Sequence, residues 1–461
     1  MSGAIEAIDR ELGAVYGSRS WLVASDVLQG AGRTVRRLRA WGAPQCFAIA
    51  ARMGVGDLPQ PEDWEHRVLG LPNAPMMEAI HSAENALRDL PREVIDAVDA
   101  FDPQRAARVI GTIVSDGRPV AGRAFWGARP RSWRELEDKV LVDRLWDACG
   151  IPRMDSEVVA VDHAALRAAH RRLDRGAGTV WAGDATKGFH GGGAYTFPVR
   201  SETEAARATE ALAKQCVRAR VMPYLEGIPC SIHGIVFPDH VVVLRPAELL
   251  VLRHAATGRF VYCRADTFWD PPTATRASMR EAARTAGTML RQSMGYRGAF
   301  TIDGVATGEG FRPTELNPRV GAALALMDAD FPFSFLHDAL VEGVAFATDP
   351  IALETSLVAR ADAARRANIA FFAEVPIASA NLPIRFDHGA WSEVERADDA
   401  DGVLTMGPGP TGSVLTLVID PDHASVGTSL APRVAILADF VDRKFGVGIG
   451  PLVPASDARS S

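Results

Sequence analysis

The feature that most constrains this chain is a pair of apolar, strand-like segments, residues 298–305 and 311–316, separated by Gly308-Glu309-Gly310. Two extended segments with a glycine-rich turn between them predict an antiparallel hairpin. In such a hairpin, Asp303 of the first strand and Glu315 of the second can face each other across the sheet. The sequence therefore predicts two carboxylates close together on one sheet face.

Polar residues continue along the second strand of this hairpin, in the run Glu315-Leu316-Asn317-Pro318-Arg319. Glu315 and Asn317 are two residues apart, so their side chains project from the same face. Together with Asp303 they offer three hard oxygen donors, which suit Mg²⁺ that shares its shell with phosphates. Arg319 would meet the same phosphates or a developing oxyanion. A half-exposed face with solvated charges is the alternative, although Pro318 interrupts an ordinary ladder.

A glycine-rich segment, residues 186–193, follows a short predicted strand. Gly191, Gly192 and their neighbours would allow backbone N–H groups to converge on phosphate oxygens, and Lys187 adds a positive charge. The segment is not a Walker A loop, because no Gly-Lys-Ser/Thr follows the glycines. A flexible hairpin turn is the alternative interpretation.

A third pattern is the apolar run 221–227, in which a strand leads into a short connector. Such a connector can offer main-chain groups to the edge of an adenine. Pro223 has no N–H, so the donor would be Tyr224 or Leu225. A buried strand end has the same pattern.

The order of these motifs over residues 132–345 resembles the ATP-grasp ligases. The resemblance implies two α+β subdomains that hold ATP between them, with Mg²⁺ on the nucleotide. It implies that Arg319 and Lys187 act in catalysis. It implies the following sites: ATP-binding Lys139, Lys187, Gly191, Gly192, Met222, Tyr224, Leu225 and Glu226, and the metal ligands Asp303, Glu315 and Asn317.

Two departures from the family pattern affect the nucleotide site. The family usually has a lysine at the end of the strand before the glycine loop, where this chain reads Val180-Trp181-Ala182-Gly183. We expect Lys187 to substitute for that lysine from the loop. A ribose-binding carboxylate often follows the connector, and Glu226 is the remaining candidate for it.

We expect an α/β and α+β protein with three domains. Alternating strands and helices over 20–50 predict an N-terminal parallel α/β domain, residues 1–131. An ATP-grasp domain would span 132–350, with subdomains 132–218 and 219–350, and a small C-terminal α+β domain would span 351–461.

Two segments, Trp133 to Cys149 and Glu84 to Phe101, are each predicted to form one helix. Gly30 and Gly32 allow a dinucleotide-binding turn, which is a distant alternative.

Composition excludes some partners and compartments. The net charge of −7 argues against a sequence-independent grip on nucleic acid, which needs a basic face. No apolar run is long enough to cross a membrane, and no signal peptide is evident. Five scattered cysteines without CxxC spacing favour a reducing, cytoplasmic setting. A homodimer remains open.

The resemblance also implies a reaction, in which a carboxylate is activated as an acyl phosphate and then attacked by an amine. The partners would be a small-molecule carboxylic acid and a peptide or another amine. Residues 381–386, 407–408 and 427–432 are similar to the C-terminal domain of the peptide ligase of pheganomycin biosynthesis, which implies a nonproteinogenic guanidino amino acid joined to a peptide N-terminus. Candidate substrate residues are Glu248, Arg253 and Arg259. A phosphotransferase of the same fold and a non-catalytic nucleotide-binding module are the alternatives.

Overall fold

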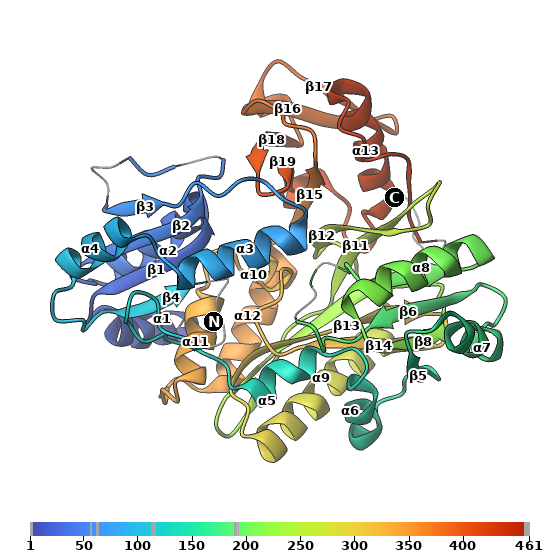
Figure 1. Cartoon of the computed structure of the whole chain (residues 1–461), viewed down its shortest axis with the longest axis horizontal. Coiled ribbons are helices and arrows are strands. Elements are labelled where there is room, and N and C mark those ends of the chain that lie inside the picture. Colours follow the sequence, from blue (N-terminus) through green and yellow to red (C-terminus); the bar gives the residue numbers. More distant parts are fainter. Residues whose placement is uncertain are drawn as a thin grey trace.

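The N-terminal part of the chain is a parallel α/β layer, with the strand order β3-β2-β1-β4 (Figure 1). The computed structural model describes residues 3–55, 58–60, 64–111, 117–188, 191 and 193–455. Neighbouring strands of this sheet are parallel, and β2 is buried along its whole length, as a sheet covered on both faces requires. The predicted parallel α/β arrangement of the N-terminal region is therefore confirmed. Its elements are α1 (Gly3–Tyr16), β1 (Trp21–Val27), α2 (Leu28–Ala40), β2 (Cys46–Arg52), β3 (His66–Val68), α3 (Met76–Arg88), α4 (Arg92–Phe101) and β4 (Arg108–Gly111).

Two details of this domain differ from the sequence prediction. Gly30 and Gly32 lie inside α2, which begins at Leu28, so they do not form a phosphate-binding turn. The helix expected over 84–101 is two helices, because Pro91 begins a new one and cannot continue the old one.

A second sheet follows, with the order β5-β8-β6-β7 and antiparallel neighbours. The two helices α7 and α8 pack on it around a core that includes Trp181 and Leu212. The β6–β7 hairpin carries the glycine-rich segment at its end. The elements are β5 (Glu157–Ala160), α7 (His163–Leu173), β6 (Thr179–Gly183), β7 (Thr196–Val199), α8 (Glu202–Gln215) and β8 (Arg218–Pro223).

The single helix predicted from Trp133 to Cys149 is wrong. The chain forms α5 (Arg131–Arg134), a 3₁₀ turn (Glu135–Glu137) and α6 (Val142–Cys149). The break is stabilised by Asp138, whose Oδ1 accepts a hydrogen bond from the Val140 N–H at 3.1 Å. Lys139 therefore lies on a turn between helices.

A large sheet forms the rest of the core, in the order β14-β13-β9-β11-β12-β15-β19-β18-β16-β17, with β10 on β9 and β20 on β11. The pairing of β12 with β15 continues the sheet across the boundary expected near residue 350. The run Gly407-Pro408-Gly409-Pro410 predicts a turn, but residues up to Gly409 belong to β18. The strands are β9 (Ile228–Val236), β10 (Val241–Val243), β11 (Ala247–His254), β12 (Phe260–Asp266), β13 (Gly298–Thr307), β14 (Gly310–Asn317), β15 (Ala367–Ala373), β16 (Ala380–Asp387), β17 (Ala390–Glu393), β18 (Gly402–Gly409), β19 (Gly412–Ile419) and β20 (Leu452–Val453).

Several helices pack on this sheet. The long α9 packs its buried alanines and Leu290 against β9, β10 and β14. Residues of α11 and α12 share a core with α1 and β1, which ties the N-terminal domain to the large sheet (Figure 1). The helices are α9 (Thr273–Met294), α10 (Leu324–Met327), α11 (Phe333–Val341), α12 (Pro350–Ala363) and α13 (Ala431–Phe445).

No helix among the described residues is both long enough and apolar enough to cross a membrane. The five cysteines all fall within the described ranges and none forms a disulfide.

A buried carboxyl pair joins the large sheet to the C-terminal helix. Glu248 of β11 and Asp266 of β12 are cross-strand partners, and both are almost completely buried. Glu248 accepts hydrogen bonds from the Ser429 hydroxyl at 2.5 Å and the Leu430 N–H at 3.0 Å, just before α13. Burial and the facing carboxyl raise the pKa of Glu248 well above its ordinary value, and burial raises the pKa of Asp266 to about 6. The pair is therefore most stable with a proton between the two carboxyls.

This pair predicts a pH-dependent stability. Both folded pKa values lie above the unfolded ones, so the stabilisation is complete below about pH 4. It is lost as the pH rises through about 6 for Asp266 and through the raised pKa of Glu248 for its partner. We expect Glu248→Gln, which stays neutral, to reduce the fall in urea midpoint between pH 5 and pH 8. The exposed Glu281→Gln on α9 is the control and should keep the wild-type fall.

Candidate active site

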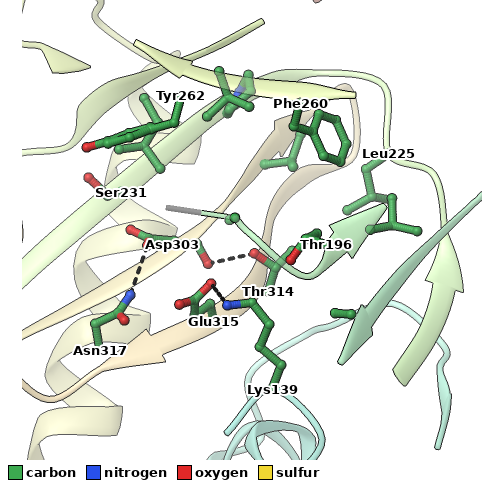
Figure 2. Close-up of a pocket in the computed structure, with 18 of the residues that line it drawn as sticks. Lys139, Thr196, Leu225, Ser231, Phe260, Tyr262, Asp303, Thr314, Glu315 and Asn317 are labelled. Atoms are coloured by element: carbon green, nitrogen blue, oxygen red, sulfur yellow. Dashed lines mark hydrogen bonds and ion pairs between the residues drawn. The ribbon is translucent and has the colours of Figure 1, made fainter. Parts of the chain in front are cut away.

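A cavity of about 360 Å³ lies between the β5–β8 sheet and the large sheet. Strands β8, β9, β11, β12, β13 and β14 all contribute side chains to its lining (Figure 2). Lys139 reaches the same cavity from the turn before α6. The cavity therefore collects polar residues from segments that are far apart in the sequence.

The floor of the cavity includes the face that the sequence predicts for β13 and β14. Asp303 and Glu315 are direct cross-strand partners, and Asn317 is the partner of Thr301. The Asn317 amide donates to Asp303 Oδ2 at 3.0 Å, and Arg319 donates to Asn317 Oδ1 at 3.1 Å. The predicted metal ligands and Arg319 thus form one hydrogen-bonded set.

Electrostatics make this set a site for positive charge. Burial and the neighbouring Glu315 raise the pKa of Asp303 to about 7, although Arg319, Lys139 and the Asn317 hydrogen bond act in the opposite direction. The Lys139 ammonium lies 2.7 Å from Glu315 Oε2. Two carboxylates held this close favour a further cation between them.

The donor set of Asp303, Glu315 and Asn317 suits Mg²⁺ better than a metal ion that takes all of its ligands from the protein. No group of three or more His, Cys, Asp or Glu suited to a metal occurs in the part of the chain that the structure describes. Two carboxylates and an amide oxygen leave coordination positions for water and phosphate, which is the usual arrangement for Mg²⁺.

The turn that carries Lys139 is held by a buried arginine that sequence reasoning did not identify. Arg220 of β8 is 3% exposed and donates to the Lys139 carbonyl at 3.3 Å and to Asp143 Oδ1 at 3.1 Å. Because β8 belongs to one sheet and Glu315 to the other, Lys139 connects the two sheets directly. The alternation of side chains along β8 could have identified Arg220, because Arg220 and Met222 are two residues apart and both line the cavity.

A second buried ion pair, also missed, holds Arg319. The Glu137 Oε1 atom lies 2.6 Å from Arg129 Nη1 and 3.5 Å from Arg319 Nε. Arg129 also donates to the Pro318 carbonyl at 2.8 Å. These contacts fix the end of β14, where Pro318 leaves the ladder.

The predicted connector lines the opposite part of the cavity. Met222, Tyr224 and Leu225 are all in the lining. The Tyr224 N–H already donates to the Gly178 carbonyl at 2.9 Å. Of the two donors considered for an adenine edge, this leaves Leu225 as the candidate.

Several predicted residues lie elsewhere. Lys187 donates to the Lys214 carbonyl at 3.3 Å and does not line the cavity. Glu226 and Arg259 are exposed and do not line it either.

Glu248 is enclosed in the pair with Asp266. Gly191 and Arg253 line the cavity, whereas Gly192 lies outside the described residues.

Comparison with known proteins shows the fold. No protein-family model and no curated protein sequence matches the chain. The structure is similar to the biotin carboxylase domain of Hydrogenobacter thermophilus 2-oxoglutarate carboxylase, with a TM-score of 0.57, 13% identity and coverage of 95% of this chain and 91% of that one. It is also similar to biotin carboxylase from Campylobacter jejuni, with a TM-score of 0.54, 14% identity and 87% coverage of both chains.

A third similar structure is carboxyaminoimidazole ribonucleotide synthase from Aspergillus clavatus, with a TM-score of 0.51, 13% identity and coverage of 93% of this chain and 99% of that one. At such identities the likeness is one of fold. It confirms the expected fold class, in which a parallel N-terminal α/β layer is followed by a core of two mainly antiparallel sheets with helices packed on them.

The geometry predicts how Asp303 responds to its neighbour. Removing the negative charge in Glu315→Gln should lower the pKa of Asp303 from about 7, because Glu315 is the main charge that raises it. Carboxyl carbon chemical shifts followed by NMR in metal-free buffer would measure this. Glu309→Gln, in the exposed turn between the same strands, should leave that pKa unchanged.

Proposed function

We propose that this protein is an ATP-dependent carboxylate–amine ligase that forms ADP and phosphate and makes an amide bond. Proteins of the same fold support this assignment. The Hydrogenobacter domain was crystallised with MgADP and bicarbonate, and the Aspergillus synthase with ATP or with ADP and 5-aminoimidazole ribonucleotide.

The observation that carries the proposal is the cavity itself. Asp303, Glu315 and Asn317 form one face, and Lys139 and Arg319 bring two positive charges to it. A phosphoryl-transfer site needs this combination, because the γ-phosphate and the attacking carboxylate repel each other.

Each group has a distinct role in the proposal. Asp303, Glu315 and Asn317 would hold Mg²⁺, which neutralises phosphate charge when bound. Lys139 leaves Glu315 for the phosphates, and Arg319 contacts the transferred phosphoryl group. Met222 and Leu225 contact the base. Lys187 remains a proposed phosphate contact only if the glycine-rich segment moves, since its ammonium bonds to the Lys214 carbonyl here.

The chemistry has two steps. A carboxylate oxygen of the acid attacks the γ-phosphorus, and the bond to the β-phosphate oxygen breaks to release ADP. The amine nitrogen then attacks the acyl carbon, phosphate leaves, and the nitrogen loses a proton. Enclosure between two sheets protects the acyl phosphate from water.

For the substrates, we propose a small carboxylic acid and a peptide or other amine in natural-product biosynthesis, in a cytoplasmic enzyme that acts as a monomer or homodimer. The resemblance of the C-terminal region supports a peptide as the amine substrate. The cavity offers the acid Arg253. Neither Glu226 nor Glu248 lines it, so a guanidinium would need a partner other than these two.

Turnover tests the proposal directly. With ATP, Mg²⁺ and panels of acids and amines, including guanidino acids and peptides, the protein should release ADP and phosphate together with an amide. Glu315→Gln should lower this rate by about 100-fold or more, because the Mg²⁺ that neutralises the phosphate charge would lose a carboxylate ligand. Glu309→Gln is the matched control and should turn over normally. Release of AMP and pyrophosphate would contradict the acyl phosphate, and phosphate retained on the product would indicate a phosphotransferase.

Nucleotide affinity gives a second test. Lys139→Met should weaken Mg·ATP binding about tenfold, equivalent to ~1.4 kcal/mol, because a charge facing the phosphates is lost. Calorimetry would measure the change. Lys214→Met, on the exposed side of α8 beside Glu210, should bind as tightly as the wild type. Equal binding by both variants would exclude a phosphate contact for Lys139.

A further inference from the structure

Strand β12 contains a bulge that changes which side chains face the cavity. Leu249 of β11 pairs with Ala265 of β12, but Val251, two residues on, pairs with Tyr262, three residues back. The extra residue is accommodated at Arg264, whose φ of 81° lies in the left-handed region. A non-glycine residue there is strained, so the surrounding structure must stabilise the bulge.

The bulge reverses the alternation of β12. Directly paired residues point to the same face, and Leu249 and Val251 both line the cavity. In a regular strand Cys263 would share the face of Ala265. Because of the bulge, Tyr262 and Phe260 face the cavity instead, and Cys263 is completely buried in the C-terminal core.

The Tyr262 hydroxyl is a polar group at the cavity. Among the residues that the structure describes, none forms a hydrogen bond with it, whereas the buried hydroxyls of Tyr16 and Tyr296 donate to backbone carbonyls. In Figure 2 Tyr262 and Phe260 lie on one side of the cavity and Asp303 and Glu315 on the other. An unpaired phenol at this place can bind a ligand that lies between the two sides.

Charges from the reaction centre reach this hydroxyl. Burial raises the pKa of Tyr262 to about 12, with a further contribution from Asp303, while Arg264 and Arg319 act to lower it. The phenol therefore keeps its proton at neutral pH and can donate it to an oxygen anion. The hydroxyl interacts electrostatically with both Asp303 and Arg319.

The wall of the cavity formed by β11 and β12 consists of Leu249, Val251, Arg253, Phe260 and Tyr262. Apart from the Tyr262 hydroxyl, it is apolar up to its outer end. Leu249 and Val251 of β11 and Phe260 of β12 supply aliphatic and aromatic surface. Arg253, the cross-strand partner of Phe260, lies at the end of the wall with its guanidinium over the Tyr224 ring, 5.7 Å from its centre. The wall carries no carboxylate of its own.

We propose that Tyr262 binds the carboxyl group of the acid substrate, donating a hydrogen bond to the oxygen that becomes the acyl oxygen, and that the substrate is an acid with an apolar body lying along Leu249, Val251 and Phe260. This inference rests on the proposed ligase function. The hydrogen bond strengthens when the amine attacks, because negative charge develops on that oxygen. Tyr262 is thus a catalytic residue of this chain, placed by the bulge at Arg264.

The test compares Tyr262→Phe with Tyr262→Leu. Phe keeps the ring and removes only the hydroxyl, which bonds to none of the residues that the structure describes, so the fold should be retained. Both variants should lose about tenfold to a hundredfold in kcat/KM for the acid, while Mg·ATP affinity measured by calorimetry stays within twofold of the wild type. Normal kcat/KM in Tyr262→Phe with a defect in Tyr262→Leu would show that the ring only packs, and would overturn the proposal.

Substrate choice tests the apolar wall separately. Phe260→Leu should shift the preference among acids toward longer or bulkier apolar bodies, and wild-type protein should prefer acids with apolar bodies over charged ones. A preference for guanidino acids would overturn the assignment of the wall. Wild-type protein that binds Mg·ATP but activates no acid, or that binds no Mg·ATP, would instead refute the ligase function itself, which separates the two failures.

Discussion

The site depends on two carboxylates that the register of one hairpin forces together. Asp303 and Glu315 face each other because β13 and β14 pair as they do, and neither can move away without breaking that ladder. Their repulsion is partly balanced by Lys139, Arg319 and the Asn317 amide. A site with this imbalance is stabilised when a cation binds to it, and in the proposed function that cation is Mg²⁺ on an anionic nucleotide.

The same cavity depends on contacts that bridge separate parts of the fold. Arg220 fixes the Lys139 turn from one sheet, and Lys139 contacts Glu315 on the other. Glu248 and Asp266 join β11 and β12 to the start of α13, directly behind the wall that carries Tyr262. Buried charged groups of this kind are destabilising when one partner is lost, so they fix the arrangement of the sheets around the cavity.

Local patterns in the sequence were sufficient for the parallel N-terminal layer, the β13–β14 hairpin and the Asp303–Glu315–Asn317 face. They failed where a local interaction or a distant partner overrode the pattern. Asp138 and the turn after it divide a segment that reads as one amphipathic helix, and Pro91 divides another. Glu248 was predicted as a candidate substrate residue, but it is enclosed by Ser429 and Leu430 from a distant part of the chain.

The sequence alone determined which residues share a face of β13 and β14, because side chains alternate along a strand and a short turn sets the register. It also determined the order of motifs on which the resemblance to the ATP-grasp ligases depends. Only the tertiary structure decided which side chains meet across the cavity. Arg220 and Tyr262 reach it through sheet packing and a bulge, and Glu137 holds Arg319 beside it through an ion pair. These arrangements depend on contacts between segments that no local pattern connects.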